Sequence, residues 1–497
     1  MIVLLQYLKN EMNKTVTENG AVTELTTYSD CLDLFATVGA LREADEAEIT
    51  QRFVRAYTEN KDTATRILFY ARDVRGGLGE RRAFRICLNW LANNAPATVM
   101  KNIALISEYG RFDDLLALLG TRCEGYAIDL IRELLFADLA ALERDEAVSL
   151  LAKWLPSINT SSPEAVKNAK RIARALGMSD AQYRKSLVAL RARIRLLENN
   201  LRERDYTFDY EKQPSRALFK YRKAFVRNDS ERYSAFLDRA VKGEAKLNAS
   251  NIAPYELVRP LLTDNFYGGF MRGVTPEEAA SLNATWASLT DFECSGNTLA
   301  VIDTSGSMYY SYAGAFPAAV ALSLGLYFAE HNKGAFGGHF IEFSENPRLI
   351  EVKGDNFVDR LRYVASFNEI ANTNIEALFD LVLDTAIKND LPQSELPDRM
   401  VIISDMEFDS CCYNSELSNF ENAKTRFEAA GYKLPQVVFW NVASRNRHQP
   451  VTMNEQGVTL LSGCTPRLFS MVTDKITTPY EFMIETLDSE RYRNISA

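Results

Sequence analysis

Two hydrophobic patterns divide this chain into an N-terminal and a C-terminal part. From about residue 30 to residue 282, apolar residues recur at intervals of three and four, as in Ile67, Tyr70, Ala71 and Val74, which is the spacing of one helix face. Turn signals interrupt the pattern. We expect stacked helix pairs in an all-α, HEAT-like repeat scaffold, although the sequence shows no clean repeat. Before it, the polar stretch 15–24 is expected to be an irregular lead-in.

The pattern changes near residue 297, where short apolar runs begin to alternate with helical stretches. Strands are expected over 298–302, 339–343, 348–352, 399–404, 436–440 and 458–461, and helices over 315–330, 357–365, 374–388, 419–430 and 466–473. This alternation is typical of a mostly parallel, doubly wound, Rossmann-like α/β sheet with helices on both faces. The expected domains are a helical-repeat domain over 1–285, an α/β domain over 290–480, and a C-terminal helix and tail over 481–497.

Candidate chemistry begins where the first expected strand ends. Asp303, Ser305 and Ser307 alternate directly after the apolar run 298–302. In an extended turn, alternate side chains point the same way and can converge on one cation. Carboxylate and hydroxyl oxygens suit Mg²⁺, or alternatively Mn²⁺ or Ca²⁺, better than zinc. The same residues could instead cap the helix that follows.

Two further polar positions follow in the order that such a site requires. Thr373 precedes a long amphipathic helix, and Asp405 ends a buried strand. With Asp303, these positions resemble the metal-ion-dependent adhesion site (MIDAS) of von Willebrand factor A domains. The resemblance implies that Ser305, Ser307 and Thr373 approach the ion. It implies that Asp303 and Asp405 hold the ion directly or through water, and that a partner's carboxylate fills an open coordination position.

The sequence offers no convincing general base or nucleophile. Isolated histidines are usually structural or solvated, and the three in this chain, His331, His339 and His448, are separated in sequence. Glu407 and Asp409 closely follow Asp405, and we interpret them as part of a solvated loop. A non-enzymatic role is therefore expected, with Mg²⁺-assisted phosphoryl chemistry as the weaker alternative.

Charge is distributed unevenly along the chain. The 497 residues carry a net charge of −9, yet residues 151–250 hold 22 Lys and Arg against 11 Asp and Glu, a local charge of +11. The other 397 residues therefore carry −20. A basic segment within an acidic protein indicates an anionic partner.

Two sets of cations in this segment have helical spacing. The first set, expected along one face of a single helix, is Arg184, Arg191, Arg195 and Arg202. The second set is Arg216, Lys220, Lys223 and Arg227. Like charges at these spacings destabilise a helix by roughly a few tenths of a kcal/mol per pair, so both sets suit contacts with RNA phosphates. Pairing with the acidic remainder of the chain, or simple solvation, is the alternative.

Several sequence blocks resemble domain-of-unknown-function family 2828. They are residues 68–81 (LFYARDVRGGLGER), 151–157 (LAKWLPS), 218–225 and 403–409 (ISDMEFD). The order of the two parts also resembles the TROVE-type architecture of Ro autoantigens, a ring of helical repeats closed by a von Willebrand factor A domain. This resemblance implies a ribonucleoprotein scaffold that binds structured or misfolded RNA, with a Mg-bearing domain that docks a protein partner. The alternative is a protein-interaction scaffold that captures an acidic partner residue through the metal, without RNA.

Composition sets the remaining expectations. The longest apolar run, residues 315–329, is too short to span a bilayer, and the first residues lack a signal-peptide core. Seven cysteines without paired spacing suit a reducing interior better than a disulfide framework. We therefore expect a cytoplasmic protein without a membrane partner.

Overall fold

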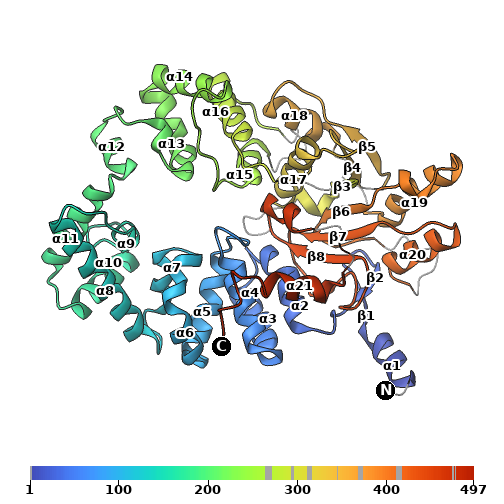
Figure 1. Cartoon of the computed structure of the whole chain (residues 1–497), viewed down its shortest axis with the longest axis horizontal. Coiled ribbons are helices and arrows are strands. Elements are labelled where there is room, and N and C mark those ends of the chain that lie inside the picture. The colour runs from blue at the N-terminus through green and yellow to red at the C-terminus, as the bar shows by residue number, and fades with distance from the viewer. Residues whose placement is uncertain are drawn as a thin grey trace. The chain divides into compact units, whose positions relative to one another are not determined.

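The computed structural model of the chain describes residues 3–263, 271–292, 296–309, 316–343, 345–367, 373–409, 417–472, 475 and 477–497. The chain forms two compact units, whose elements are labelled in Figure 1. The sheet unit comprises Met1–Asp45 and Pro214–Ser489, and the helical unit comprises Glu46–Gln213 and Glu490–Ala497. The backbone therefore passes between the two units three times, after residues 45, 213 and 489.

The helical unit is built from α-helices joined by short turns. They are α3 (Glu46–Glu59), α4 (Lys61–Arg72), α5 (Arg82–Asn94), α6 (Pro96–Asn102), α7 (Ile106–Tyr109), α8 (Glu124–Glu143), α9 (Leu151–Trp154), α10 (Pro163–Ala175), α11 (Asp180–Ile194) and α12 (Leu197–Glu203). Local sequence fixes where some of them begin. The Ser179 hydroxyl accepts a hydrogen bond from the Gln182 N–H at the start of α11, and the Gln182 side chain accepts one from the Ser179 N–H. Helices that are close in sequence pack on each other, which confirms the helical pattern expected for this region.

The sheet unit is built around six strands in the order β5-β4-β3-β6-β7-β8 (Figure 1). They are β3 (Thr298–Asp303), β4 (His339–Phe343), β5 (Arg348–Glu351), β6 (Arg399–Ser404), β7 (Gln436–Asn441) and β8 (Val458–Ser462). All the pairings are parallel except the one between β4 and the edge strand β5, which is antiparallel. The six expected strands are thus present to within one residue at either end, in the doubly wound arrangement that their alternation with helices predicted.

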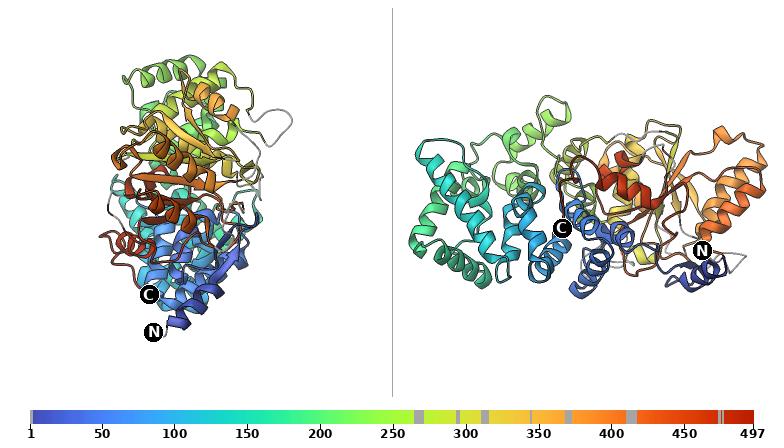
Figure 2. Two further views of the ribbon diagram at one scale, coloured as in Figure 1. Left: turned by 90° about the vertical axis from the view of Figure 1, so that its right-hand side faces the viewer. Right: turned by 60° about the horizontal axis from the view of Figure 1, so that its bottom comes forward.

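Helices cover both faces of this sheet (Figures 1 and 2). On one face α19 (Ile375–Lys388) and α20 (Asn419–Ala429) contact each other, and their buried residues Phe379 and Phe427 share a core with Phe439 of β7. On the other face α17 (Pro317–His331) packs against β3. A Cβ atom at Gly325 of α17 would lie 1.5 Å from Cδ1 of Ile302, so only glycine allows this approach. α18 (Phe357–Val364) packs on α17, and α21 (Pro479–Leu487) packs on β8.

The N-terminal segment is not the irregular lead-in that its sequence suggested. After α1 (Val3–Asn13), an antiparallel hairpin is formed by β1 (Lys14–Val16) and β2 (Val22–Glu24). The end of β2 also pairs with a distant loop, since Glu24 and Gln449 exchange backbone hydrogen bonds of 3.0 and 2.8 Å. Short polar strands carry little hydrophobic pattern of their own, so pairing with distant backbone gives this segment its structure.

Several helices from the expected helical domain belong to the sheet unit. They are α2 (Asp30–Thr37), α13 (Ser215–Asn228), α14 (Ser230–Val241), α15 (Pro254–Val258) and α16 (Pro276–Ala287). α2 packs on β8 and α15 packs on α17, while Trp286 of α16 stacks on Phe357 of α18 with ring centroids 4.2 Å apart. The change of pattern near residue 297 therefore marks a change in secondary structure, whereas the packing of the elements divides the chain into units after residues 45, 213 and 489.

Candidate functional site

The candidate site lies at the carboxyl ends of the two central strands. β3 and β6 are parallel neighbours, with Ile302 opposite Ile403. The sheet continues from β3 to β4 in one direction and from β6 to β7 in the other, so this pair is the topological switch point, where doubly wound sheets bind ligands. Asp303 is the last residue of β3, and Asp405 directly follows β6. The strand register therefore brings both predicted aspartates to one edge.

Asp303 is buried, with 1% of its surface exposed. Its Oδ1 accepts a hydrogen bond of 2.9 Å from the Ser305 N–H, and its Oδ2 accepts one of 2.5 Å from the Ser404 hydroxyl. Burial, followed by the negative charge of Asp405, raises the pKa of the Asp303 carboxyl to about 7. Two buried carboxylates close enough to affect each other's ionisation favour a cation between them.

The two predicted serines connect the aspartates. Ser305 and Ser307 lie in the turn after β3, and their Oγ atoms are 3.2 Å apart. The Ser307 side chain is hydrogen-bonded to the Asp405 carboxyl group, which is also buried. Burial raises the pKa of Asp405, although the charge of Arg445 and this hydrogen bond oppose the rise. Four of the five predicted site residues are thus joined in one hydrogen-bonded chain.

Thr373, the fifth predicted residue, is buried just before α19. Its backbone N–H donates a hydrogen bond to the Asp409 carboxylate, and the Asp409 N–H returns one of 3.0 Å to the Thr373 carbonyl oxygen. These bonds fix the Thr373 segment against the segment that follows Asp405. The structure thus places Thr373 beside the loop that carries Asp405, and its hydrogen bonds go to Asp409.

Arg445 belongs to the site but was missed from the sequence. Its Nη2 donates a hydrogen bond of 2.7 Å to Asp405 Oδ2, and its Nη1 donates one of 2.7 Å to Glu18 of the N-terminal hairpin. A single arginine 40 residues after Asp405 has no distinguishing pattern in the sequence. Only the fold shows that the positive charge of Arg445 lies against one carboxylate oxygen of Asp405, one of the two buried aspartates.

The interpretation of Glu407 as part of a solvated loop is wrong. Its side chain is 1% exposed, and it accepts hydrogen bonds from Asn446 Nδ2 at 2.8 Å and from the Glu18 N–H at 2.9 Å. His448 Nε2 lies 3.1 Å from the same carboxylate, so this histidine has a structural role. Burial alone would raise the pKa of Glu407, but the hydrogen bond with His448 and the other partners lower it. The N-terminal hairpin covers this residue, which local sequence could not indicate.

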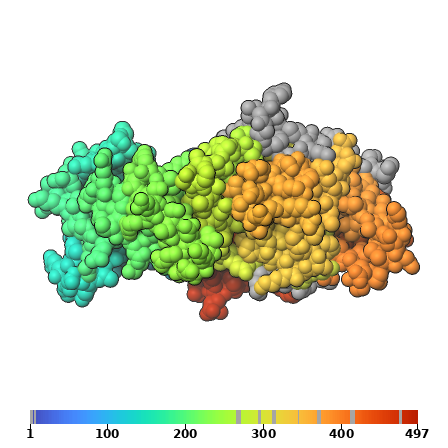
Figure 3. Space-filling model, turned by 90° about the horizontal axis from the view of Figure 1, so that it is seen from above, coloured from blue at the N-terminus to red at the C-terminus, as the bar shows by residue number. Residues whose placement is uncertain are grey.

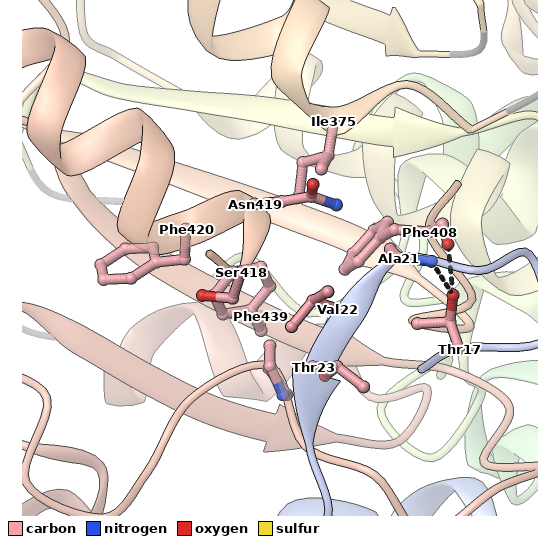
Figure 4. A pocket seen from close by; sticks show the side chains of 11 residues that line it. Thr17, Ala21, Val22, Thr23, Ile375, Phe408, Ser418, Asn419, Phe420 and Phe439 are labelled. Carbon is pink, nitrogen blue, oxygen red and sulfur yellow. Dashed lines mark hydrogen bonds between the residues drawn. The ribbon is translucent and has the colours of Figure 1, made fainter. Parts of the chain in front are cut away.

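The hairpin also closes the region between the sheet edge and α20 (Figure 4). Thr17 Oγ1 donates a hydrogen bond of 2.5 Å to the Phe408 carbonyl oxygen and accepts one of 3.0 Å from the Ala21 N–H. The cavity left between Val22 and Phe420 has a volume of about 10 Å³, which is about enough for one water molecule. It is too small to be a ligand pocket.

The donor set at the sheet edge fits a hard cation. Within the described part of the chain, no group of three or more His, Cys, Asp and Glu side chains is arranged to hold a metal ion. The buried pair Asp303 and Asp405 instead adjoins the hydroxyls of Ser305 and Ser307. An all-oxygen set with few carboxylates suits Mg²⁺, which keeps several waters, and does not suit zinc.

The first set of predicted RNA-binding cations does not lie on one helix. α11 ends at Ile194, Arg195 adopts a left-handed conformation with φ of 53°, and Arg202 lies on the separate helix α12. Arg191 points into the protein, where it donates hydrogen bonds of 2.8 Å to the Ala152 carbonyl oxygen and 2.7 Å to that of Leu155. Burial lowers the pKa of its guanidinium group. The side chains of Arg184, Arg195 and Arg202 are exposed.

The second set lies on one helix, as predicted. Arg216, Lys220, Lys223 and Arg227 are all exposed on α13, which lies on the face seen in Figure 3. Two of them have acidic partners. Arg216 donates two hydrogen bonds to Glu256, of 2.9 and 3.0 Å, and Lys223 Nζ lies 3.8 Å from Glu278. The stripe is real, and Arg216 and Lys223 are already paired with glutamates of the chain.

The structure and the comparisons together define a class of protein with an α-helical part and a doubly wound α/β sheet. The chain belongs to the family of the domain of unknown function DUF2828, which matches residues 17–129 and 127–293. A second domain of unknown function, DUF7788, matches residues 297–491. The block at residues 403–409, attributed above to the first family, therefore lies in the part that matches the second.

Two similar proteins complete the comparison. The uncharacterised protein L728 of Acanthamoeba polyphaga mimivirus is 29% identical, over 93% of this chain and 84% of the viral protein. The crystal structure of the Ro (RSR) protein of Deinococcus radiodurans covers 94% of this chain and 100% of its own, at 12% identity and a TM-score of 0.39. That score is too low to support conclusions about function. Among the residues that the structure describes, no helix is long and apolar enough to span a membrane.

Proposed function

We propose that this protein is a non-enzymatic binding scaffold whose sheet edge holds a divalent cation and docks a partner through it, as a von Willebrand factor A domain does. One observation carries the proposal: Asp303 and Asp405, both buried, converge at the switch point of the sheet and are linked by serine hydroxyls. Buried like charges are costly unless a cation neutralises them. The strand order and the antiparallel edge strand β5 are consistent with this class of domain.

The roles of the residues follow from their positions. Ser305, Ser307 and Thr373 would approach the ion through their hydroxyls, and the two aspartates would hold it directly or through water. A bound Mg²⁺ would supply a Lewis acid with an exchangeable position, which suits a carboxylate from a protein partner. The protein's own contribution is to keep both aspartates buried and aligned, which β3 and β6 do through their register.

Thermal unfolding with added Mg²⁺ tests this proposal. A cation that binds only the folded chain raises its melting temperature in proportion to the logarithm of its concentration above the dissociation constant. We expect this rise for the wild type and its loss in Asp303→Ala. Asp359→Ala, which removes an exposed carboxylate from α18, is the matched control and should keep the rise. A melting temperature of the wild type that does not respond to Mg²⁺, Mn²⁺ or Ca²⁺ would refute the metal site.

Binding of structured RNA is a second proposed function, and the exposed cationic stripe of α13 favours it. Lys220 and Arg227 are exposed on the same helix as the acid-paired cations Arg216 and Lys223, and Lys220 Nζ lies 4.8 Å from the centre of the Tyr221 ring. Lys and Arg in a row on one helix can contact successive phosphates, and each contact releases counterions from the nucleic acid. The pairing of Arg216 and Lys223 with glutamates means that RNA must compete for these two cations.

A salt series separates RNA binding from a purely protein-binding scaffold. If α13 contacts phosphates, the logarithm of the affinity for a structured RNA falls linearly with the logarithm of the salt concentration. Changing Arg216, Lys220, Lys223 and Arg227 together to Ala should flatten that slope. No detectable binding of the wild type at low salt would refute the RNA proposal and leave the protein-docking function.

A further inference from the structure

The last eight residues of the chain lie in the helical unit as a specifically bound segment that contains a turn, closed by a hydrogen bond of 3.0 Å from the Ile495 N–H to the Tyr492 carbonyl oxygen. They leave the sheet unit after Ser489 and contact α4, α6 and α7. Two of their side chains are buried, Tyr492 with 3% of its surface exposed and Ile495 with none. This segment therefore contributes core residues to a unit from which it is separated by 276 residues of sequence, since the rest of that unit ends at Gln213.

Arg491 is the polar anchor of the segment. Its Nη2 donates a hydrogen bond of 2.7 Å to Asp73 Oδ1, and its Nε donates a second to Asp73 Oδ2. The guanidinium carbon lies 4.7 Å from the centre of the Tyr109 ring, and the Tyr109 hydroxyl donates a hydrogen bond to the Arg491 carbonyl oxygen. A bidentate pair with a fully buried carboxylate, combined with an aromatic face, is selective for arginine over lysine.

Tyr492 fills a neighbouring aromatic pocket. Its ring meets that of Tyr70 edge-on at a centroid distance of 5.7 Å, and that of Tyr109 at 5.9 Å. Its hydroxyl donates a hydrogen bond of 2.8 Å to Asp73 Oδ2. Asp73 is thus contacted by two adjacent side chains of the segment, and the pocket requires both an aromatic ring and a donor at its tip.

The backbone of the segment is recognised as well. Arg66 donates hydrogen bonds to the carbonyl oxygens of Ile495, at 3.2 Å, and Arg493, at 3.3 Å. Asn102 donates one of 2.7 Å to the Ser496 carbonyl oxygen. Side chains from two helices thus bind main-chain groups of the segment on the far side of its turn.

The loop that presents Asp73 is rigid for reasons that do not involve the segment. The Asp73 carbonyl oxygen accepts hydrogen bonds from the N–H groups of Gly77, at 3.2 Å, and Gly79, at 3.1 Å, and the Asp73 carboxylate accepts one of 2.9 Å from the Arg75 N–H. The preceding residue, Arg72, forms a buried ion pair of 2.7 Å with Asp114. These contacts belong to the block LFYARDVRGGLGER at residues 68–81.

Gly76 explains why this turn is rich in glycine. A Cβ atom there would lie 2.8 Å from Cδ of Arg491 and 2.8 Å from Oδ2 of Asp73. The missing side chain therefore leaves room for the arginine of the bound segment. Gly77 has a different role, because a Cβ at that position would lie 2.0 Å from the Tyr70 carbonyl oxygen and would disrupt the turn itself.

From this arrangement we infer that the helical unit carries a preformed peptide-binding groove, centred on Asp73, for a turn-forming segment of the form Arg-Tyr-x-x-Ile. Residues 490–497 are the ligand of this groove, supplied by the chain itself. Docking of this segment is intramolecular, and the same segment from a second copy of the chain competes for the groove. The inference is independent of the metal site and of RNA.

A peptide exchange experiment tests the groove. The chain is ended at Ser489, and a fluorescent peptide with the sequence of residues 488–497 is titrated into it. We expect saturable binding to the shortened chain, and binding to the full chain that is about a hundredfold weaker or more because the groove is already filled. Changing Arg491 to Ala in the peptide should abolish binding. The matched control is Arg493→Ala, because that side chain is largely exposed and pairs with Glu490 of the same segment, while Arg66 contacts the Arg493 backbone oxygen.

Variants of the groove complete the test. Gly76→Ala should weaken binding of the peptide by about tenfold or more, because the added methyl group contacts Arg491, and the variant should still fold. Arg55→Ala, which changes an exposed side chain on α3, should not change the affinity for the peptide. If the shortened chain does not fold, a protease site inserted after Ser489 in the full chain allows cleavage after folding, followed by exchange with the labelled peptide. A folded shortened chain that fails to bind the peptide, or binding that Arg491→Ala leaves unchanged, would overturn the inference.

Discussion

The guanidinium group of Arg445 lies 2.7 Å from Oδ2 of Asp405, at the edge of the sheet where a divalent cation is proposed to bind. The permanent positive charge of Arg445 thus offsets part of the negative charge of Asp405, one of the two buried carboxylates. It also connects that carboxylate to Glu18 of the N-terminal hairpin. The proposed metal and this arginine therefore act on the same negative charge, and their effects on stability should be linked.

Removal of Arg445 should increase the response to metal. In Arg445→Ala the two buried carboxylates lose their fixed counter-charge, so the metal-free protein becomes less stable and Mg²⁺ recovers more of the difference. We expect a lower melting temperature without metal and a larger Mg²⁺-dependent rise than in the wild type. Differential scanning calorimetry with and without a chelator measures both. Arg426→Ala, which removes an arginine paired with Asp380 on a different helix, should leave the Mg²⁺-dependent rise unchanged.

Asp303→Asn should separate stability from metal binding. The amide keeps the shape of the side chain but removes a buried negative charge next to Asp405, so the metal-free variant should be at least as stable as the wild type near neutral pH. It should also lose the Mg²⁺-dependent rise in melting temperature. A variant that is destabilised without metal would show that the carboxylate has a favourable structural role, contrary to the proposal.

Arg191 should prove structural, although its spacing placed it with the RNA-binding cations. Arg191→Ala removes hydrogen bonds to the carbonyl oxygens of Ala152 and Leu155 and to the Ser157 hydroxyl. Loss of such charge-assisted bonds at a partly buried site costs about 2 kcal/mol or more. Arg184→Ala on the same helix removes an exposed side chain and should change stability by about 0.5 kcal/mol at most. Urea unfolding followed by circular dichroism compares the two variants.

The cations of α13 should contribute unequally to RNA binding. Arg227→Ala should reduce the slope of log affinity against log salt by about 0.9, the value for one phosphate that loses its cation. Arg216→Ala should reduce the slope less, because Arg216 has a glutamate partner that RNA must displace. Equal effects of the two variants would show that the ion pair with Glu256 does not persist in solution.

Stability should fall with rising pH because of Asp33. Burial raises the pKa of this carboxyl to about 6, while hydrogen bonds from Thr26 and Thr27 oppose the rise. The folded state therefore keeps a proton between about pH 4 and pH 6 that the unfolded state releases, and by linkage its stability decreases as pH increases across that window. Asp33→Asn should remove this part of the slope. The melting temperature measured across the window checks it, with Asp355→Asn, which changes an exposed carboxyl group distant in sequence from Asp33, as the control that retains the slope.

Much of the sheet could be predicted from sequence because its signals are local. A fully buried parallel strand is a continuous apolar run, and β3 and β6 are each buried at every position. Asp303 and Asp405 could be identified because each directly follows such a run, and parallel strands place their carboxyl ends at one edge. The cations of α13 could be identified in the same way, since one uninterrupted helix preserves their spacing.

Features that depend on distant partners could not be predicted. Arg445, Glu18 and His448 have no distinguishing local pattern, and only the fold brings them to Asp405 and Glu407. The helix α11 ends just before Arg195, although the periodicity of the sequence predicts that it continues. A single residue in a left-handed conformation does not change the hydrophobic pattern, so the sequence does not reveal this end.

By itself, the sequence determined the succession of strands and helices, the order of the oxygen ligands and the uneven distribution of charge, because these depend on residues close together in the chain. The tertiary structure decided which cations are exposed, which carboxylates are paired with a positive charge, and where the last eight residues bind. Asp73 illustrates the difference. Its sequence block specifies a glycine-rich turn, but its contacts with Arg491 and Tyr492 arise only when segments more than 400 residues apart fold together.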